Sequence, residues 1–150
     1  MAVLAWNYGK FETVESEGGE PKAASQWTQI DVPKKDSLKV DPKEGETKEA
    51  LDEQGNIVDS KTTPATYEIL WEMFVKKGVE PPFDGEDGVI AGEHAFRFTP
   101  DDPACKGWRV DRATVSAAIS FSTSEGTLYK YKAKVLKPKA GKAFKLEVIS

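Results

Sequence analysis

Hydrophobic and polar residues alternate with a period of two over most of the chain, as expected for strands with one buried face. The clearest case is TYEILWEMFVKK, residues 66–77, whose second face mixes Leu70 and Phe74 with Glu68 and Glu72. Such a mixture predicts a strand that is half covered on its second side. The first face is apolar throughout, and we expect it to be buried: Tyr67, Ile69, Trp71, Met73 and Val75.

The same alternation predicts further strands over LAWNYGKFETV, SQWTQIDVP, AGEHAFRFTP and KAFKLEVIS. In the last of these, Phe144, Leu146 and Val148 alternate with charged residues. The segment RATVSAAISFSTSEGTLYKYKAKVLKP predicts a hairpin that turns at residues 124–126, because Gly126 can adopt the positive φ of a tight turn. These elements indicate a mainly antiparallel sheet.

One short helix is predicted over TPDDPACKGW, residues 99–108. Thr99 is a suitable N-cap, Pro100 suits the first helical position, and Gly107 can end the helix after one or two turns. The predicted fold is therefore a single domain, residues 1–150, built as an antiparallel β-sandwich or barrel with one short helix.

A long polar excursion, residues 43–63, interrupts the alternating strands. GETKEALDEQG within it is compatible with a short helix or with one arm of a hairpin. We favour the hairpin, because Gln54-Gly55-Asn56 is strong turn chemistry and the IVDSKTT that follows has β-branched character.

Composition places the chain among soluble globular proteins, with 39% hydrophobic and 31% charged residues in 150. No apolar run approaches the roughly 20 residues that cross a bilayer, and the first residues lack the pattern of a signal peptide. The single Cys105 cannot form an internal disulfide. We therefore expect folding in a cytoplasm and no membrane partner.

Charge is divided unevenly along the chain. Residues 126–150 carry a net charge of +6, whereas the whole chain carries −4, so residues 1–125 carry −10. Oppositely charged patches allow identical molecules to meet head to tail. An acidic protein is a poorer candidate for tight binding of nucleic acid.

No residue pattern indicates catalysis. His94 is the only histidine and alternates with Phe96 and Phe98, which predicts a half-buried ring held by a hydrogen bond. For Cys105 a small buried residue is expected, and one cysteine with one histidine cannot form a structural zinc site. The acidic DGEDG at residues 84–88 lacks the spacing of a calcium-binding loop. We expect no enzyme activity, no metal and no cofactor.

Two long stretches resemble the tail-tube-like structural proteins of bacteriophages and prophages, particularly those of gut Bacteroidetes genomes. They are PKKDSLKVDPKEGETKEALDEQGNIVDSKTTPATYEILWEMFV and DGVIAGEHAFRFTPDDPACKGWRVDRATVSAAISFSTSEGTLYKYKAKVLKPKAG. The resemblance implies hexameric rings that stack into a tube, with other tail proteins such as the tape measure as partners. DNA would be a non-specific passing cargo, and the protein would be made in the bacterial host cytoplasm and reside in the virion tail.

Carried over by position, the resemblance makes residues 43–63 a long loop or hairpin that reaches a neighbouring subunit. Glu68 and Glu72 would face the lumen of the tube. The residues expected at the assembly interface are Lys43, Gly45, Glu46, Lys48, Glu49, Gly55, Asp59, Lys61, Lys130, Lys132 and Lys134.

The rival interpretation is a β-sandwich module that recognises a glycan or a protein. Its basis is the set of four tryptophans, Trp6, Trp27, Trp71 and Trp108, some of which could stack on a sugar ring at the surface.

Overall fold

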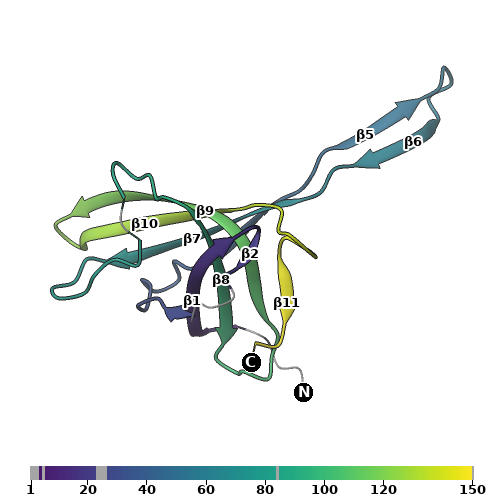
Figure 1. The fold of residues 1–150 in the computed structure, drawn as a ribbon. Helices are drawn as coiled ribbons and strands as arrows, with labels where there is room; N and C mark the ends of the chain where they lie inside the picture. The colour runs from purple at the N-terminus through teal and green to yellow at the C-terminus, as the bar shows by residue number, and fades with distance from the viewer. Residues whose placement is uncertain (1–3, 5, 23–26, 84, 150) are drawn as a thin grey trace.

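The computed structural model describes residues 4, 6–22, 27–83 and 85–149. Within these ranges it contains strands, turns and loops and no helix (Figure 1). The predicted mainly antiparallel β architecture is thus confirmed. The strands are β1 (Tyr8–Glu17), β2 (Glu20–Pro21), β3 (Thr28–Gln29), β4 (Lys39–Lys43), β5 (Thr47–Leu51), β6 (Ile57–Thr62), β7 (Thr66–Phe74), β8 (Glu93–Pro100), β9 (Gly107–Ser122), β10 (Gly126–Val135) and β11 (Lys145–Glu147).

Nine strands form one sheet in the order β2-β1-β8-β9-β10-β7-β4, with β3 paired to β1 and β11 paired to β9. Phe11 on β1 and Trp71 on β7 are four strands apart, a distance of about 19 Å in a flat sheet. Their ring centroids nevertheless lie 5.1 Å apart, so the sheet bends back and its two halves face each other across the core. Because the ends of the path, β2 and β4, do not pair within the described ranges, the predicted sandwich or barrel is not confirmed.

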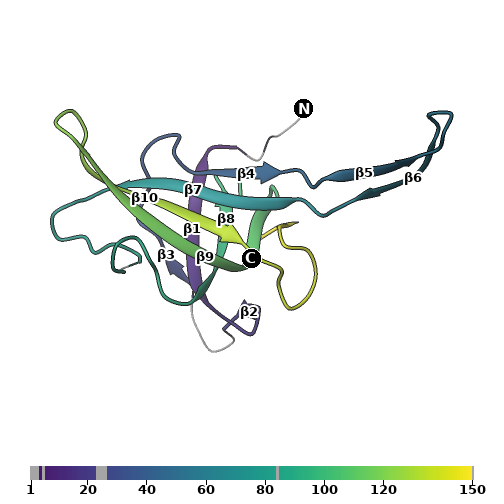
Figure 2. The same cartoon turned by 90° about the horizontal axis from the view of Figure 1, so that it is seen from above.

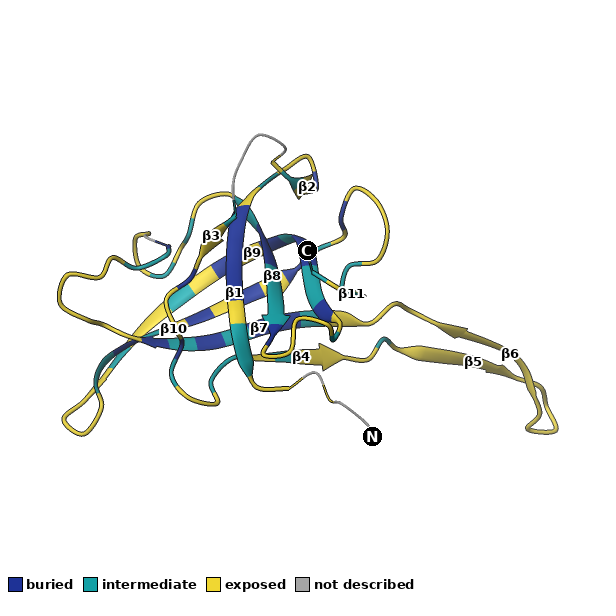
Figure 3. Ribbon diagram, turned by 90° about the horizontal axis from the view of Figure 1, so that it is seen from below, coloured by how far each residue is buried: buried dark blue, intermediate teal, exposed yellow. Residues whose placement is uncertain are grey.

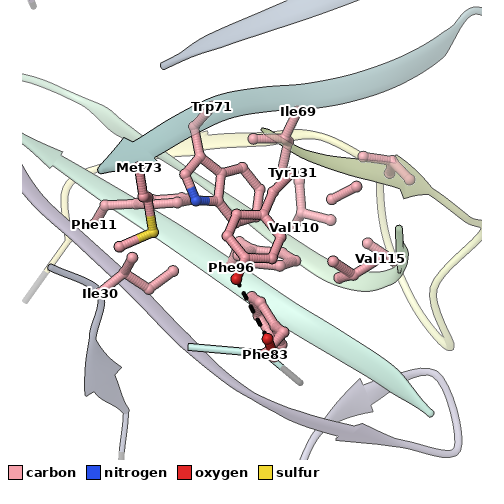
Figure 4. Packing of buried hydrophobic residues seen from close by; sticks show 13 residues of the cluster. Phe11, Ile30, Ile69, Trp71, Met73, Phe83, Phe96, Val110, Val115 and Tyr131 are labelled. Atoms are coloured by element: carbon pink, nitrogen blue, oxygen red, sulfur yellow. Dashed lines mark hydrogen bonds between the residues drawn. The ribbon is translucent and has the colours of Figure 1, made fainter. Parts of the chain in front are cut away.

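Aromatic rings fill the space between the two halves (Figure 4). Trp71 stacks on Tyr131 with centroids 5.2 Å apart and meets Phe96 at 5.5 Å. The predicted apolar face of residues 66–77 is largely confirmed, since Ile69, Trp71 and Met73 are buried. Tyr67 is only partly buried, and Val75, which follows the end of β7, is 45% exposed.

The hairpin predicted around residue 126 is confirmed. β9 and β10 pair from Ala113 with Val135 to Ser122 with Gly126, and Gly126 has a φ of 78°. The N-terminal half of β9 pairs instead with β8 and β11. At the far end of the hairpin, Ile119 and Phe121 extend beyond the core and are exposed.

The helix predicted over residues 99–108 is wrong. β8 continues through Thr99 and Pro100, which pair with Lys10 and Tyr8 of β1. The chain then turns at Asp102, whose carbonyl accepts a hydrogen bond from the Cys105 amide at 3.0 Å. Long-range pairing with β1 therefore outweighs the local capping signals. The described residues include no helix with the length and apolar character of a membrane span.

The final strand, β11, directs its charged residues toward the body. Arg109 forms an ion pair with Glu147 at 3.0 Å, and Lys145 pairs with the buried Asp111. Leu146 and Val148 are consequently exposed. Ion pairs with β9, and not apolar burial, set the orientation of this strand.

Candidate assembly interface

Strands β5 and β6 form a two-stranded arm that leaves the body as a continuation of β4 and β7 (Figure 2). The two strands pair from Thr47 with Thr62 to Leu51 with Ile57. Every residue of both strands is exposed, and neither strand contacts any other strand of the body (Figure 3). The hairpin predicted within residues 43–63 is confirmed, and the alternative helix is wrong.

The turn at the end of the arm is built by Asp52 and Gly55. Gly55 has a φ of 84°, which a residue with a side chain rarely adopts. The Asp52 carboxylate accepts hydrogen bonds from the amides of Gln54 and Asn56, each at 2.9 Å. The bond from Asn56 is the main cause that lowers the pKa of Asp52, so this carboxylate is ionised at neutral pH.

At the base of the arm the two strands approach so closely that position 45 requires glycine. A Cβ on Gly45 would lie 1.8 Å from the carbonyl oxygen of Thr63. The amide of Thr63 donates to the Glu46 carbonyl at 2.9 Å, and the amide of Glu46 donates to the Thr63 hydroxyl at 2.8 Å. Gly55 thus forms the turn that the sequence predicted, whereas Gly45 is required by the close approach of the two segments.

The end of the arm combines acidic and apolar side chains. Leu51, Ile57 and Val58 are 60%, 59% and 63% exposed, and β5 and β6 contact no other strand that the structure describes. Residues 51–59 also carry three acidic residues and no lysine or arginine. We call residues 51–59 the arm tip.

Along the arm, Lys48 and Lys61 lie directly opposite each other in the register. Like charges at facing positions destabilise a pair of strands. Neither lysine forms an ion pair within the described part of the chain. Of the other expected interface residues, Glu46, Glu49 and Asp59 also belong to the exposed arm.

Of the remaining expected interface residues, Lys43 lies on β4 and three lysines lie on β10, and together they meet the two glutamates expected in the lumen. Glu68 on β7 binds Lys132 and Lys43, each at 3.3 Å, and Glu72 binds Lys130 at 3.8 Å. The lysines expected at the assembly interface and the glutamates expected in the lumen therefore lie on the same face of the sheet. Lys134 lies on the same face, with Glu68 as its register partner on β7.

Glu68 carries the one resolved pKa shift on this face. Its partial burial raises the pKa of the carboxyl, but hydrogen bonds from Lys132 and Lys43 outweigh burial and lower the pKa overall. The carboxylate is thus held ionised between two ammonium groups.

Strand β4 forms an open edge of the sheet. It pairs with β7 on one side and has no second strand partner within the described residues. Pro42 fits such an edge, because a proline cannot donate to a further strand at that position. An open edge is the place at which a strand of another chain can be added.

A hollow that the sequence did not reveal lies in the seam between the two ends of the bent sheet. We call it the aromatic pocket. It has a volume of about 860 Å³ and is lined on one side by Lys39 and Val40 of β4. The other side comes from separate segments, and its aromatic residues are Trp6, Tyr8, Phe98, Trp108 and Phe144.

The floor of the aromatic pocket is a continuous stack. Trp108 stacks on Phe98 at 5.7 Å and on Phe144 at 5.6 Å between ring centroids. Trp6 is 66% exposed beside them. At the rim, Lys35 and Lys39 form no ion pair within the described residues, and Lys34 is paired with Glu125 at 2.6 Å. Asp36 also lines the pocket and forms no ion pair within the described residues. The floor is therefore apolar, and the rim carries two lysines and one aspartate beside the paired Lys34.

The other candidate residues do not form a reactive site. The His94 ring packs on Phe83 with centroids 4.7 Å apart, and its Nε2 lies 3.3 Å from the Ala91 carbonyl, which confirms the half-buried, hydrogen-bonded histidine. Cys105 is partly exposed in the turn after β8 and not buried as expected. Asp84 lies outside the described residues. Elsewhere in the described chain, no group of three His, Cys, Asp or Glu side chains is placed to hold a metal.

Comparison with known proteins gives little further information. No protein-family model and no curated protein matches the chain. Among solved structures it is similar to one described as "Cryo-EM Structure of an Extracellular Contractile Injection System, PVC sheath/tube terminator in extended state". That match has a TM-score of 0.45 and 14% identity, over 83% of this chain and 88% of the other. An overlap of this extent establishes neither fold nor function, so the role of the chain is inferred from its own surfaces.

Proposed function

We propose that this chain is a tail-tube-like structural subunit of a phage or prophage, which self-assembles and has no enzymatic activity. The observation that carries the proposal is the arm of β5 and β6, whose strands are fully exposed and contact only each other. An element of this kind contributes nothing to the core of its own body. It gains a role when a second copy covers it.

The energetics of the arm favour a partner. A two-stranded hairpin alone in water is marginally stable, and ordering each residue costs about 1–2 kcal/mol of backbone entropy. Full burial of an aliphatic side chain returns about 1.5–3 kcal/mol. Leu51, Ile57 and Val58 are available for such burial, and acidic groups of a second copy would relieve the repulsion between Lys48 and Lys61.

The open edge of β4 supplies a second contact of the same kind. Strand addition at an edge satisfies backbone hydrogen-bonding groups and is a common mode of association. Because β4 leads directly into the arm, edge and arm form one continuous surface along the molecule (Figure 2). Several copies can therefore extend an assembly in one direction.

The resemblance of the sequence to tail-tube-like proteins supplies the finer parts of the proposal. These are hexameric rings that stack into a tube, contact with other tail proteins such as the tape measure, and passage of DNA without specific binding. On the face that carries Glu68 and Glu72, the carboxylates already engage three lysines. Lysines that are already paired with carboxylates neutralise fewer phosphates and release fewer counterions from the DNA, so a lumen lined by this face would hold duplex weakly.

The proposal is tested by the association state of the purified chain. We expect sedimentation velocity over a range of concentrations and salt to show growth from monomer to larger species, and negative-stain images to show rings or tubes. A variant that retains Gly45 and Thr63 but replaces residues 46–62 by a short Gly-Ser linker should remain monomeric. Monomer alone for the full-length chain under all these conditions would contradict the proposal.

A glycan-binding or protein-binding module is the second candidate, and the aromatic pocket favours it. Trp6 and Trp108 present ring surface of the type on which sugars stack. Binding to a glycan array that disappears in Trp108→Ala, together with a strictly monomeric chain, would support this alternative over assembly.

A further inference from the structure

The arm tip has a distinct chemical character. Its apolar side chains, Leu51, Ile57 and Val58, lie close in sequence to three carboxylates. Asp52 is held in the turn by the two hydrogen bonds that its carboxylate accepts from backbone amides. At neutral pH residues 51–59 carry a charge of −3. A surface that covers this tip must therefore offer an apolar floor and a cationic rim.

The aromatic pocket has this combination. Its floor is the stack of Phe98, Trp108 and Phe144. Its rim carries Lys35 and Lys39, which form no ion pair within the described residues, and one carboxylate, Asp36, so the lysines outnumber it. Its volume of about 860 Å³ is in the range of clefts that hold sizeable ligands, about 300–1,000 Å³. A β-turn with two or three aliphatic side chains is of suitable size.

The tip cannot occupy the pocket of its own chain in this structure. From Lys43 to Asp52 the arm extends nine residues away from the body, which corresponds to about 30 Å at strand geometry. Lys39 and Val40, which line the pocket, come before Lys43 on β4. β4 belongs to the body, and the arm extends away from it (Figure 2). A tip that enters a pocket must come from another molecule.

We infer that the aromatic pocket of one copy is the receptor for the arm tip of a second copy. This inference rests on the proposed function and names the surface that completes it. In the complex, the apolar residues of the tip lie on the aromatic floor, while Glu53 and Asp59 face Lys35 and Lys39.

The geometry also limits the spacing of neighbours. Lys39 at the pocket and Asp52 at the tip are 13 residues apart along nearly continuous strands, at most about 43 Å. If the arm tip of one copy lies in the aromatic pocket of the next, that tip marks the position of the second pocket. The distance between the pockets of the two copies then equals the distance from pocket to tip within one copy. The repeat between adjacent linked copies is therefore no more than about 43 Å.

Another apolar surface competes as the receptor. Ile119 and Phe121 at the end of the β9–β10 hairpin are 69% and 71% exposed. The turn of this hairpin itself carries a carboxylate, Glu125, which is paired with Lys34 at 2.6 Å. The aromatic pocket is the better match for an acidic tip.

Disulfide trapping between differently tagged copies tests the assignment. One copy carries Gln54→Cys at the tip and the other carries Lys35→Cys at the pocket rim, both with Cys105→Ser. Mild oxidation should link the two tags at least tenfold faster than it does with Lys137→Cys or Ser122→Cys in the second copy. Lys137 and Ser122 are exposed control positions away from the pocket, and Ser122 lies beside the competing hairpin end.

Sedimentation of the same mixtures separates the two ways to fail. Assembled species with faster trapping at position 122 or 137 would overturn the pocket assignment and leave the proposed function intact. Absence of assembly in the Cys105→Ser background, when the unmodified chain also stays monomeric, would overturn both.

Charge exchange gives an independent readout. Lys35→Glu with Lys39→Glu should weaken assembly at least tenfold, as should Glu53→Lys with Asp59→Lys, and the four changes together should restore it. Lys137→Glu with Lys142→Glu in place of the rim changes gives the same net charge and should not restore it. Equal restoration by both sets would show an effect of net charge alone and contradict the inference.

Discussion

At the scale of single residues, the arm depends on the glycine at its base. Gly45 allows the two segments at the base of the arm to approach so closely that a Cβ at this position would overlap the Thr63 carbonyl. Overpacking of this kind typically costs about 1–3 kcal/mol. Because a lone two-stranded hairpin is marginally stable, a local cost of this size is sufficient to open it.

We therefore predict that Gly45→Ala separates the strands of the arm while the body stays folded. Hydrogen exchange should show loss of protection at the amides of β5 and β6, with core amides such as those of β10 unchanged. Glu44→Ala, one residue away and exposed, is the matched control and should keep the arm protected. Equal protection in both variants would contradict the close approach at position 45.

Glu68 gives the outer face a dependence on pH. The two lysines beside it hold its pKa below the ordinary value of 4.5, although partial burial acts in the opposite direction. The folded state thus binds a proton at Glu68 less readily than the unfolded state. The stabilisation is present above about pH 4.5 and is lost as the pH falls through the lowered folded-state pKa.

The corresponding prediction concerns Glu68→Gln. Its free energy of unfolding should be lower than that of the unchanged chain at pH 7, and the difference should shrink in acid, when Glu68 is protonated. Urea unfolding at pH 7 and at pH 3 measures both values. Glu80→Gln changes an exposed carboxylate without an ion pair in the described chain and should show no such dependence. A difference for Glu68→Gln that grows in acid would contradict the assignment.

At the scale of elements, the arm and the body are separate units of stability. β5 and β6 contact each other and no other strand, whereas the body is held by the aromatic cluster around Trp71. A surface substitution without core contacts usually changes the free energy of unfolding by no more than about 0.5 kcal/mol, and the whole arm consists of such exposed residues.

Replacement of residues 46–62 by a Gly-Ser linker should accordingly leave the unfolding of the body nearly unchanged, within about 0.5 kcal/mol. Trp71→Ala in the full-length chain is the contrasting variant and should cost about 3–5 kcal/mol, because it empties the centre of the core. Chemical denaturation followed by tryptophan fluorescence or circular dichroism compares them. A large loss of body stability in the shortened chain would show that the arm supports the core.

Sequence patterns predicted elements well where local and long-range preferences agree. Alternation located β7 and the β9–β10 hairpin, and turn chemistry at Gln54-Gly55-Asn56 located the arm. The helix over residues 99–108 was wrong because β1 recruits Thr99 and Pro100 into a strand. Pairing with a partner some 90 residues away leaves no signal in a local window.

At the scale of the whole molecule, the two ends of β7 differ. The arm leaves one end of β7, and the opposite end of β7 lies beside the β9–β10 turn, where the Val75 amide donates to the Thr127 carbonyl at 3.0 Å. The aromatic pocket lies between these ends, in the seam of the bent sheet. The arm tip and its proposed receptor thus lie at different places on the molecule, which permits open chains or closed rings.

The arm half of this interface could be predicted from sequence, and the receptor half could not. Acidic and apolar residues of the arm tip are contiguous, at residues 51–59. The aromatic floor comes from Phe98, Trp108 and Phe144 on three separate segments. It lies beside β4, which does not pair with β1 within the described residues. Whether a sheet closes depends on how strongly all of its strands twist and bend together. The alternation of hydrophobic and polar residues does not specify this.

The central claim is that the arm of one copy binds another copy, and a capping assay tests it most directly. A chain without residues 46–62 retains the aromatic pocket but has no arm, so it can receive a neighbour and cannot extend further. Added at about one-tenth of the full-length chain, it should shorten the assemblies seen in negative stain and lower their mean sedimentation coefficient. Assemblies of unchanged length and sedimentation in its presence would contradict the claim.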